Sequence, residues 1–308
     1  MMTTGPVVFV IIPVYNGSNY IRQAIESILA QTYQDREIIV VNDGSTDQGA
    51  TRQAVMSYGN QVRYIEKENS GISSTLNCGI QAMKGEYFAW LSHDDLFDRE
   101  KLSNQMERIL ASGNPGAIAQ VNCSFFSEET QNTIFTDFHK YYPLERMKSG
   151  LFLLLWDEIH FSTLLFHKNH FDRVGFFRED LATAQDNEFA FRLLRGQMNV
   201  FEEKPVSRVR IHQNSGTNRY HDVVDRENRI LYSSIAQQLT EDEMRAVCGA
   251  PSNFLCKLAG AVKSMGGEEE LDSVERLLWE KLPKQSQPSH YEPIQKQWTN
   301  SIIFGAGQ

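Results

Sequence analysis

Two adjacent aspartates, Asp94 and Asp95, are well suited to bind a divalent cation. They follow the apolar run at residues 87–91 and have no cationic neighbour in the immediate sequence, so a hard ion such as Mg²⁺ or Mn²⁺ would offset their charges. Such ions also bind diphosphate oxygens. The alternative is that the pair only leads into a helix near Asp98, and for these residues alone the two interpretations carry similar weight.

A second acidic loop favours the functional interpretation. Asp43 follows the apolar run at residues 38–41 and opens the sequence DGSTD. An isolated Asp-Gly-Ser is more often a turn, with Asp47 as a helix cap. Directly after a strand, however, an aspartate can accept a hydrogen bond from the imide N–H of uracil or thymine. Pro13 and Tyr15, which follow the first apolar run, would then form the facing wall.

Strands must position these loops. Apolar runs at residues 7–12, 38–41, 87–91 and 118–121 are typical of strands buried on both faces. Helical patterns lie between them, and alternating strands and helices predict a parallel, doubly wound α/β sheet. The apolar helix faces are Ile21, Ile25, Ile28 and Leu29; Leu76, Ile80 and Met83; and Leu102, Met106, Ile109 and Leu110.

Composition limits the classes of function. The formal net charge of -9 disfavours nucleic acid or an anionic membrane as a partner. The longest apolar runs, 7–12 and 151–156, are too short for a transmembrane segment, and no signal peptide pattern is present. The cysteines lack zinc-site spacings, which favours reduced thiols and a cytoplasmic protein: Cys78, Cys123, Cys248 and Cys256.

Four motifs in order, IIPVYN, EIIVVNDGSTD, ENSGISSTLNCGI and GEYFAWLSHDD, resemble those of family 2 glycosyltransferases with a GT-A fold. The resemblance covers roughly residues 7–215. It implies a Rossmann-like, mostly parallel sheet flanked by helices, and an inverting reaction that uses a nucleotide sugar. By this resemblance Asp43 contacts the base, Asp94 lies near the donor ribose or sugar, and Asp95 binds Mn²⁺ or Mg²⁺.

The same resemblance implies further site residues. Asp186 matches the general base, which removes the proton of an acceptor hydroxyl within about 3 Å. His212 matches a late histidine near the donor phosphates or metal, so the predicted metal ligands are Asp95 and His212. His160, His167 and His170 lack a zinc pattern and are interpreted as structural. The predicted donor nucleotide-binding residues are Pro13, Tyr15, Asn16, Asp43, Gly71, Asn77 and Asp94.

Two positions depart from the family pattern. Many relatives carry aspartate at the position of Ser92 and arginine at the position of Leu76. Because Ser92 replaces the first aspartate, Asp94 and Asp95 make up the whole metal motif. Because Leu76 replaces the arginine, the sequence does not identify the donor sugar.

The predicted domains are a catalytic domain at 1–225, with a nucleotide-sugar half at about 1–120 and an acceptor half at about 121–225, and a helical C-terminal extension at 226–308. The apolar residues of the extension predict packing on the catalytic domain, with a homodimer contact as the alternative. One aromatic set is a candidate acceptor surface, or alternatively packs helices against the sheet: Phe125, Phe126, Phe135, Phe138, Tyr141 and Tyr142.

The sequence therefore predicts a metal-dependent, inverting glycosyltransferase. Its donor would be a UDP- or dTDP-sugar, and its acceptor a glycan or glycolipid in surface polysaccharide or glycoconjugate synthesis. One alternative is a catalytically weak nucleotide-sugar-binding scaffold, against which Asp186 argues. The other is a nucleotidyltransferase, which would open with a Gly-rich phosphate loop that this sequence lacks. An HD-type hydrolase would need a histidine before His93, the first in the chain.

Overall fold

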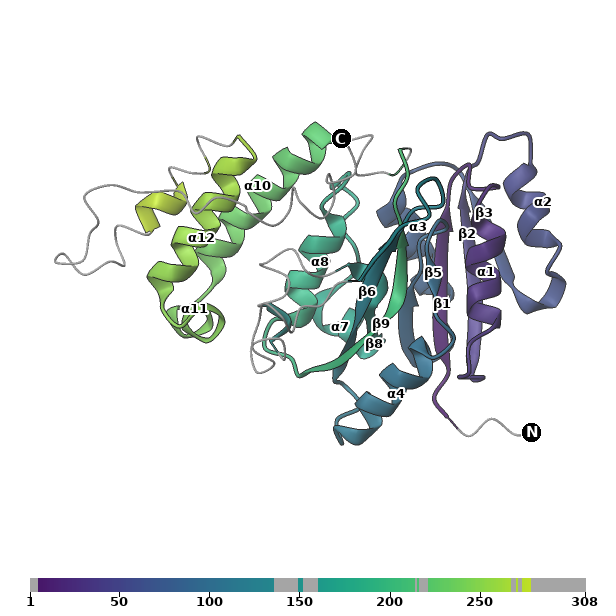
Figure 1. Cartoon of the computed structure of the whole chain (residues 1–308), viewed down its shortest axis with the longest axis horizontal. Coiled ribbons are helices and arrows are strands. Elements are labelled where there is room, and N and C mark those ends of the chain that lie inside the picture. The colour runs from purple at the N-terminus through teal and green to yellow at the C-terminus, as the bar shows by residue number, and fades with distance from the viewer. Residues whose placement is uncertain are drawn as a thin grey trace. The chain divides into compact units, whose positions relative to one another are not determined.

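The computed structural model describes residues 5–135, 149–151, 160–213, 215, 221–266, 270 and 273–277. The chain forms two compact units, Met1–Gln213 and Asn214–Gln308 (Figure 1). Residue 225, where the sequence suggests a domain boundary, lies within α10 (His221–Gln238). No helix in the described part of the chain is long and apolar enough to cross a membrane.

A parallel segment forms the first part of the sheet. β1 is buried along its whole length, as is the second half of β2, because helices cover both faces. Val14 pairs with Asn42, so β1 and β2 end side by side and their following loops share one edge. The spatial order is β3 (Arg63–Lys67), β2 (Arg36–Asp43), β1 (Val8–Val14) and β4 (Tyr87–Trp90).

Helices pack on opposite faces of these strands. α1 (Ile21–Leu29) and α4 (Lys101–Ala111) share a core cluster with alternate residues of β1, whereas α3 (Ile72–Ala82) packs against the other face. α2 (Ala50–Met56) lies beside α1. The predicted apolar faces are largely correct, but Leu110 is 63% exposed and does not belong to the buried face of α4.

Antiparallel strands extend the sheet. β8 (Leu164–His167) pairs antiparallel with both β4 and β6 (Ile118–Phe126). β9 (Asn199–Arg210) runs parallel to β6 and pairs antiparallel with the short β5 (Leu96–Phe97). With β7 (Thr133–Phe135) beside β6, the strands among the described residues form one sheet. The predicted α/β class with a mostly parallel sheet is confirmed.

An aromatic core lies on the α3 face near β4 and β8. Phe189 lies on α8 (Gln185–Leu194) and stacks on Phe177, with 4.3 Å between the ring centroids. Trp90 packs against Phe161 at 5.1 Å between centroids. Among the candidate acceptor aromatics, Phe126 is buried. Phe138, Tyr141, Tyr142 and the side chain of Phe135 lie outside the described residues.

The second unit is helical, as predicted. α10, α11 (Glu241–Cys248) and α12 (Pro251–Ser264) pack on one another. α11 begins with a capping box between Thr240 and Glu243, and α12 begins with Pro251, whose missing N–H costs nothing at a helix start. Trp279, Trp298 and the other apolar residues near the C-terminus lie outside the described part, so the homodimer stays a prediction.

Candidate functional site

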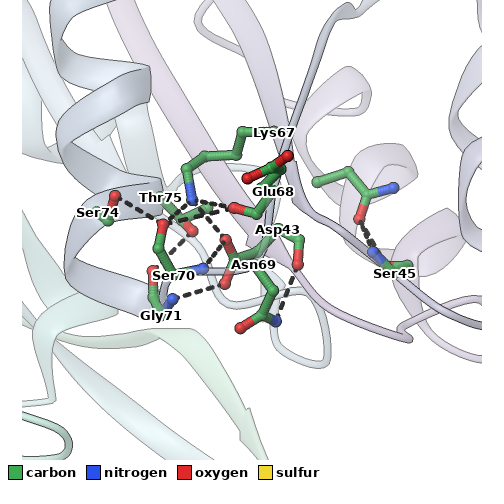
Figure 2. A network of polar contacts seen from close by, with 10 residues as sticks. Asp43, Ser45, Lys67, Glu68, Asn69, Ser70, Gly71, Ser74 and Thr75 are labelled. Atoms are coloured by element: carbon green, nitrogen blue, oxygen red, sulfur yellow. Dashed lines mark hydrogen bonds and ion pairs between the residues drawn. The ribbon is translucent and has the colours of Figure 1, made fainter.

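The carboxylate of Asp43 lies at the end of β2 and is hydrogen-bonded on both oxygens (Figure 2). Oδ1 accepts from Lys67 Nζ at 2.7 Å and from the Ser70 N–H at 3.0 Å, and Oδ2 accepts from the Gly71 N–H at 2.9 Å. Gly71 precedes α3 with φ at 90°, which favours glycine. Asp43 thus ties β3 and the start of α3 to β2. Within the described residues, Oδ2 keeps one lone pair for a further donor.

The loops after β1, β2 and β4 meet at the carboxyl edge of the sheet. The Asn16 N–H donates to Ser45 Oγ at 2.9 Å, and Asn16 Oδ1 accepts from the Thr46 N–H at 2.7 Å. A side chain at Gly17 would collide with the ring of His93, so these two loops touch. The polar loops that carry Tyr15, Asp43 and the Asp94–Asp95 pair are therefore neighbours.

Pro13 and Tyr15 differ in exposure. Pro13 is buried inside β1 opposite Val41, whereas the side chain of Tyr15 is 45% exposed. Of the two residues predicted as a wall of the base pocket, only Tyr15 offers a surface for stacking.

Asp95 is buried and incompletely compensated. Oδ1 accepts from the Arg210 N–H at 2.9 Å, and no described residue donates to Oδ2. Burial raises the pKa of Asp95 well above its usual value, and the charge of Asp94 raises it further, against the effect of Arg210. A divalent cation would stabilise the ionised form.

Asp94 contacts the predicted metal ligand His212. His212 Nε2 lies 2.9 Å from Asp94 Oδ2, so the histidine pairs with the first aspartate rather than with Asp95. Burial alone would raise the pKa of Asp94, but the hydrogen bond from His212 and the neighbouring His93 bring that pKa below its usual value. The surroundings thus favour the ionised form of Asp94 and disfavour that of Asp95.

Arg210 is a site residue that the sequence analysis missed. Its guanidinium is buried and donates from Nε to the backbone oxygen of Asp94 at 2.7 Å and from Nη2 to Gln23 Oε1 at 2.7 Å. It also forms an ion pair with Glu128 and lies over the ring of Tyr20 at 4.3 Å. Arg210 thus fixes the loop of both aspartates. The only signal in the sequence is its place two residues before His212.

His160 is a second residue whose position the sequence did not reveal. Burial lowers the pKa of His160 to about 4, and the charge of Asp94 opposes this effect. His167 Nδ1 accepts from the Asn169 N–H, and His170 Nε2 lies 2.9 Å from a backbone oxygen. Of these three histidines, only His160 has a pKa that is shifted by the charge of Asp94.

Asn77 connects α3 to the segment before α8. Its Oδ1 accepts from the Phe177 N–H at 3.0 Å, and its Nδ2 donates to the Phe177 oxygen and to Glu179 Oε1, both at 2.9 Å. The side chain is buried. Its polar atoms are thus used within the protein, and contact with the donor stays a prediction.

The two acidic residues at the start of α8 differ in their surroundings. Glu188 is buried, and both its oxygens accept from Arg192, at 2.7 and 2.6 Å. Arg192 also donates to the Phe176 oxygen at 3.0 Å, so the pair holds the preceding turn. Asp186 is partly exposed and accepts from the Asn187 N–H at 2.8 Å. Of the two, Asp186 is the more exposed carboxylate, and its role as the base stays a prediction.

No group of three or more histidine, cysteine, aspartate or glutamate side chains within the described residues is arranged to hold a metal ion. The oxygens of Asp94 and Asp95 are nevertheless hard donors of the kind that Mn²⁺ and Mg²⁺ prefer. Substrate oxygens would complete the coordination, as is common for Mg²⁺ at phosphate sites.

Residues 9–172, slightly more than half of the chain, match the family model described as Glycosyl transferase family 2. An uncharacterized glycosyltransferase of Rickettsia felis is 39% identical over 254 residues, which are 82% of this chain and 42% of that protein. The chain thus spans less than half the length of this relative.

Two solved structures share the fold. The mannosyltransferase PcManGT of Pyrobaculum calidifontis, in complex with GDP-Man and Mn²⁺, has a TM-score of 0.61 at 18% identity, over 86% of this chain and 74% of that one. Staphylococcus aureus TarS 1–349, in complex with UDP, has a TM-score of 0.57 at 16% identity, over 93% and 94% of the two chains.

Proposed function

The chain belongs to glycosyl transferase family 2, and from this premise we propose that it transfers a sugar from a nucleotide-diphosphate donor to an acceptor hydroxyl, with inversion. One observation carries the proposal: β9 brings Arg210 to Asp95 and His212 to Asp94 from more than 110 residues away. The result is a fixed acidic site beside the loop of Asn16 and Tyr15.

The donor base is proposed to lie between Tyr15 and Asp43. The open lone pair on Asp43 Oδ2 suits the imide N–H of uracil or thymine, which favours UDP- or dTDP-sugars. Lys67 holds the carboxylate in place, and Asn16 fixes the loop that carries Tyr15. The complexes of TarS with UDP and of PcManGT with GDP-Man support a nucleotide-sugar donor for this fold.

Asp95, with Asp94 and His212 beside it, is proposed to hold Mn²⁺ or Mg²⁺. The raised pKa of Asp95 marks a carboxylate that the protein does not compensate by itself. When bound, the ion would neutralise charge on the departing nucleoside diphosphate. Arg210 keeps the backbone of Asp94 and the carboxylate of Asp95 in place for this role.

Asp186 is proposed as the general base. A carboxylate at the start of α8 can take the proton of the acceptor hydroxyl while its oxygen attacks the anomeric carbon opposite the leaving group. The Glu188–Arg192 pair and Asn77 hold the turn before α8, which positions Asp186. A single displacement inverts the anomeric centre.

The acceptor is proposed to be a glycan or glycolipid in surface polysaccharide or glycoconjugate synthesis, and the catalytic part to be roughly residues 1–225. A homodimer through the extension remains the alternative to packing within one chain. A nucleotide-sugar-binding scaffold that lacks catalysis is the second candidate function, because both schemes share the donor site.

A donor screen tests the proposal. Thermal shifts would be measured with UDP-glucose, UDP-galactose, UDP-N-acetylglucosamine, dTDP-glucose and GDP-mannose in the presence of Mn²⁺, since a ligand at 100 times its Kd stabilises the fold by about 2.7 kcal/mol. Slow hydrolysis of the stabilising donor would then identify an enzyme, and its absence a scaffold. Stabilisation by none of these donors would exclude both.

A further inference from the structure

His160 lies immediately before a short 3₁₀ turn, η3 (Phe161–Thr163), and is held by a chain of two hydroxyl groups. Its Nδ1 is 2.8 Å from Ser162 Oγ, which lies 2.9 Å from Ser207 Oγ on β9. Ser162 and Ser207 are both buried. The orientation of the imidazole is therefore fixed by the contact at Nδ1.

The other ring nitrogen, Nε2, has no hydrogen-bond partner within the described part of the chain, and the side chain of His160 keeps some exposed surface. An imidazole that is anchored through one nitrogen and open at the other is the usual arrangement of a histidine that binds a ligand. The low pKa of the ring, about 4, keeps it neutral near pH 7, so it interacts as a hydrogen-bonding group.

Two independent contacts connect the segment of His160 to the segments that carry or hold the aspartates. Ser207 is three residues before Arg210, whose N–H binds Asp95. Phe161 packs on Trp90, which ends β4 four residues before Asp94. Both connections lead from the His160 segment to the segments next to Asp94, in agreement with the effect of the Asp94 charge on the ring.

We propose that His160 Nε2 hydrogen-bonds a hydroxyl group of the sugar being transferred and contributes to the choice of donor sugar. The inference rests on the proposed function. With Nδ1 anchored, Nε2 either donates or accepts one hydrogen bond, and a sugar hydroxyl can be both donor and acceptor.

Calorimetric binding separates contact with the sugar from contact with the nucleotide. The probes are the tightest-binding donor of the five above and its free nucleoside diphosphate, each titrated into the full chain with Mn²⁺. His160→Ala should weaken binding of the intact donor about 3- to 10-fold, the value of one hydrogen bond, and leave the free diphosphate unchanged. His160→Gln retains a polar amide, so its affinity for the intact donor should lie between those of the alanine variant and the unaltered chain. This variant replaces His160→Ala in the test if the alanine variant fails to fold.

The matched control is His167→Gln, which alters a histidine at the end of β8 and should leave both affinities unchanged. Ser162→Ala should reproduce part of the His160→Ala loss, because it removes the anchor of the ring. Equal weakening of donor and free diphosphate, or no weakening of either, would overturn the role of His160. Failure of the unaltered chain to bind any of the probes would instead remove the proposed function, and the inference with it.

Discussion

Asp43 and Asp95 both lie at carboxyl ends of the parallel strands, yet their charges are compensated differently. Asp43 has Lys67 and two backbone N–H groups on its oxygens. Asp95 is equally buried, has one N–H, and stands beside a second aspartate. The first carboxylate is a structural joint that can also bind a ligand. The charge of the second is incompletely compensated by the protein, which is the physical basis for proposing that it binds the metal.

The largest expected effect comes from Asp95→Asn. Transfer should fall below detection, because the amide cannot replace the charged ligand, and EDTA should do the same to the unaltered protein. Without metal, the melting temperature of this variant should equal or exceed that of the unaltered chain, since a disfavoured buried charge is removed. Transfer assays and calorimetry would measure both. Full activity in chelator would refute the metal assignment.

The comparison extends to α8, where Glu188 is compensated by Arg192. Asp186→Asn should lower kcat by roughly two to four orders of magnitude with donor affinity nearly intact, as expected for loss of a general base. Steady-state kinetics and donor titration would separate the two quantities.

The matched variant is Glu188→Gln, which should mainly lower stability because it leaves Arg192 without its carboxylate. Normal turnover by Asp186→Asn, with a large loss of kcat in Glu188→Gln, would reverse the assignment of the base.

Asp43→Asn should affect stability and donor binding together. The amide retains one oxygen for its N–H donors but leaves Lys67 without its anionic partner, at a cost of about 1–3 kcal/mol in the free energy of unfolding. Nucleotide affinity should fall about tenfold as the loop loosens. Urea denaturation and UDP titration would measure these changes. A variant of unchanged stability would show that the Lys67 contact contributes nothing measurable.

The smallest expected effect is a pH dependence. The pKa of Asp95 is raised in the folded protein, so the folded state binds this proton more tightly than the unfolded state. Metal-free stability contributed by Asp95 should therefore fall as the pH rises from its ordinary pKa through the raised one, whereas Mn²⁺ affinity should rise by at most about tenfold per pH unit. Thermal melts with and without Mn²⁺ would measure this. Comparison with Asp95→Asn across the same pH range isolates the contribution of Asp95 to the pH dependence of stability. Identical stability profiles for the variant and the unaltered chain would contradict this prediction.

The sequence predicted β1, β2, β4 and β6, whose buried residues give apolar runs, but not β8, which is also mostly buried. No such run marks β3, whose residues are largely half-exposed, or β9, where Glu202, Glu203 and Pro205 interrupt the pattern at a register shift. The aspartates were found because they directly follow apolar strands.

Arg210 and His160 could not be found in this way. Their roles depend on which strand lies beside which, and the relevant contacts join residues far apart in sequence. Asn77 shows the converse: a motif residue whose hydrogen-bonding groups the fold uses at a point 100 residues away.

The position of β9 also bears on the order of events during synthesis. Among the described strands it is the last of the sheet to leave the ribosome and the one that pairs with β5, which follows the two aspartates directly. A nascent chain that ends before residue 199 has no partner for β5, no Arg210 and a pair of uncompensated acids. Such long-range pairing is slow to form. Until β9 has been synthesised, the unpaired edge of the sheet and the exposed face of β6 are therefore the regions of this protein that a chaperone is most expected to bind.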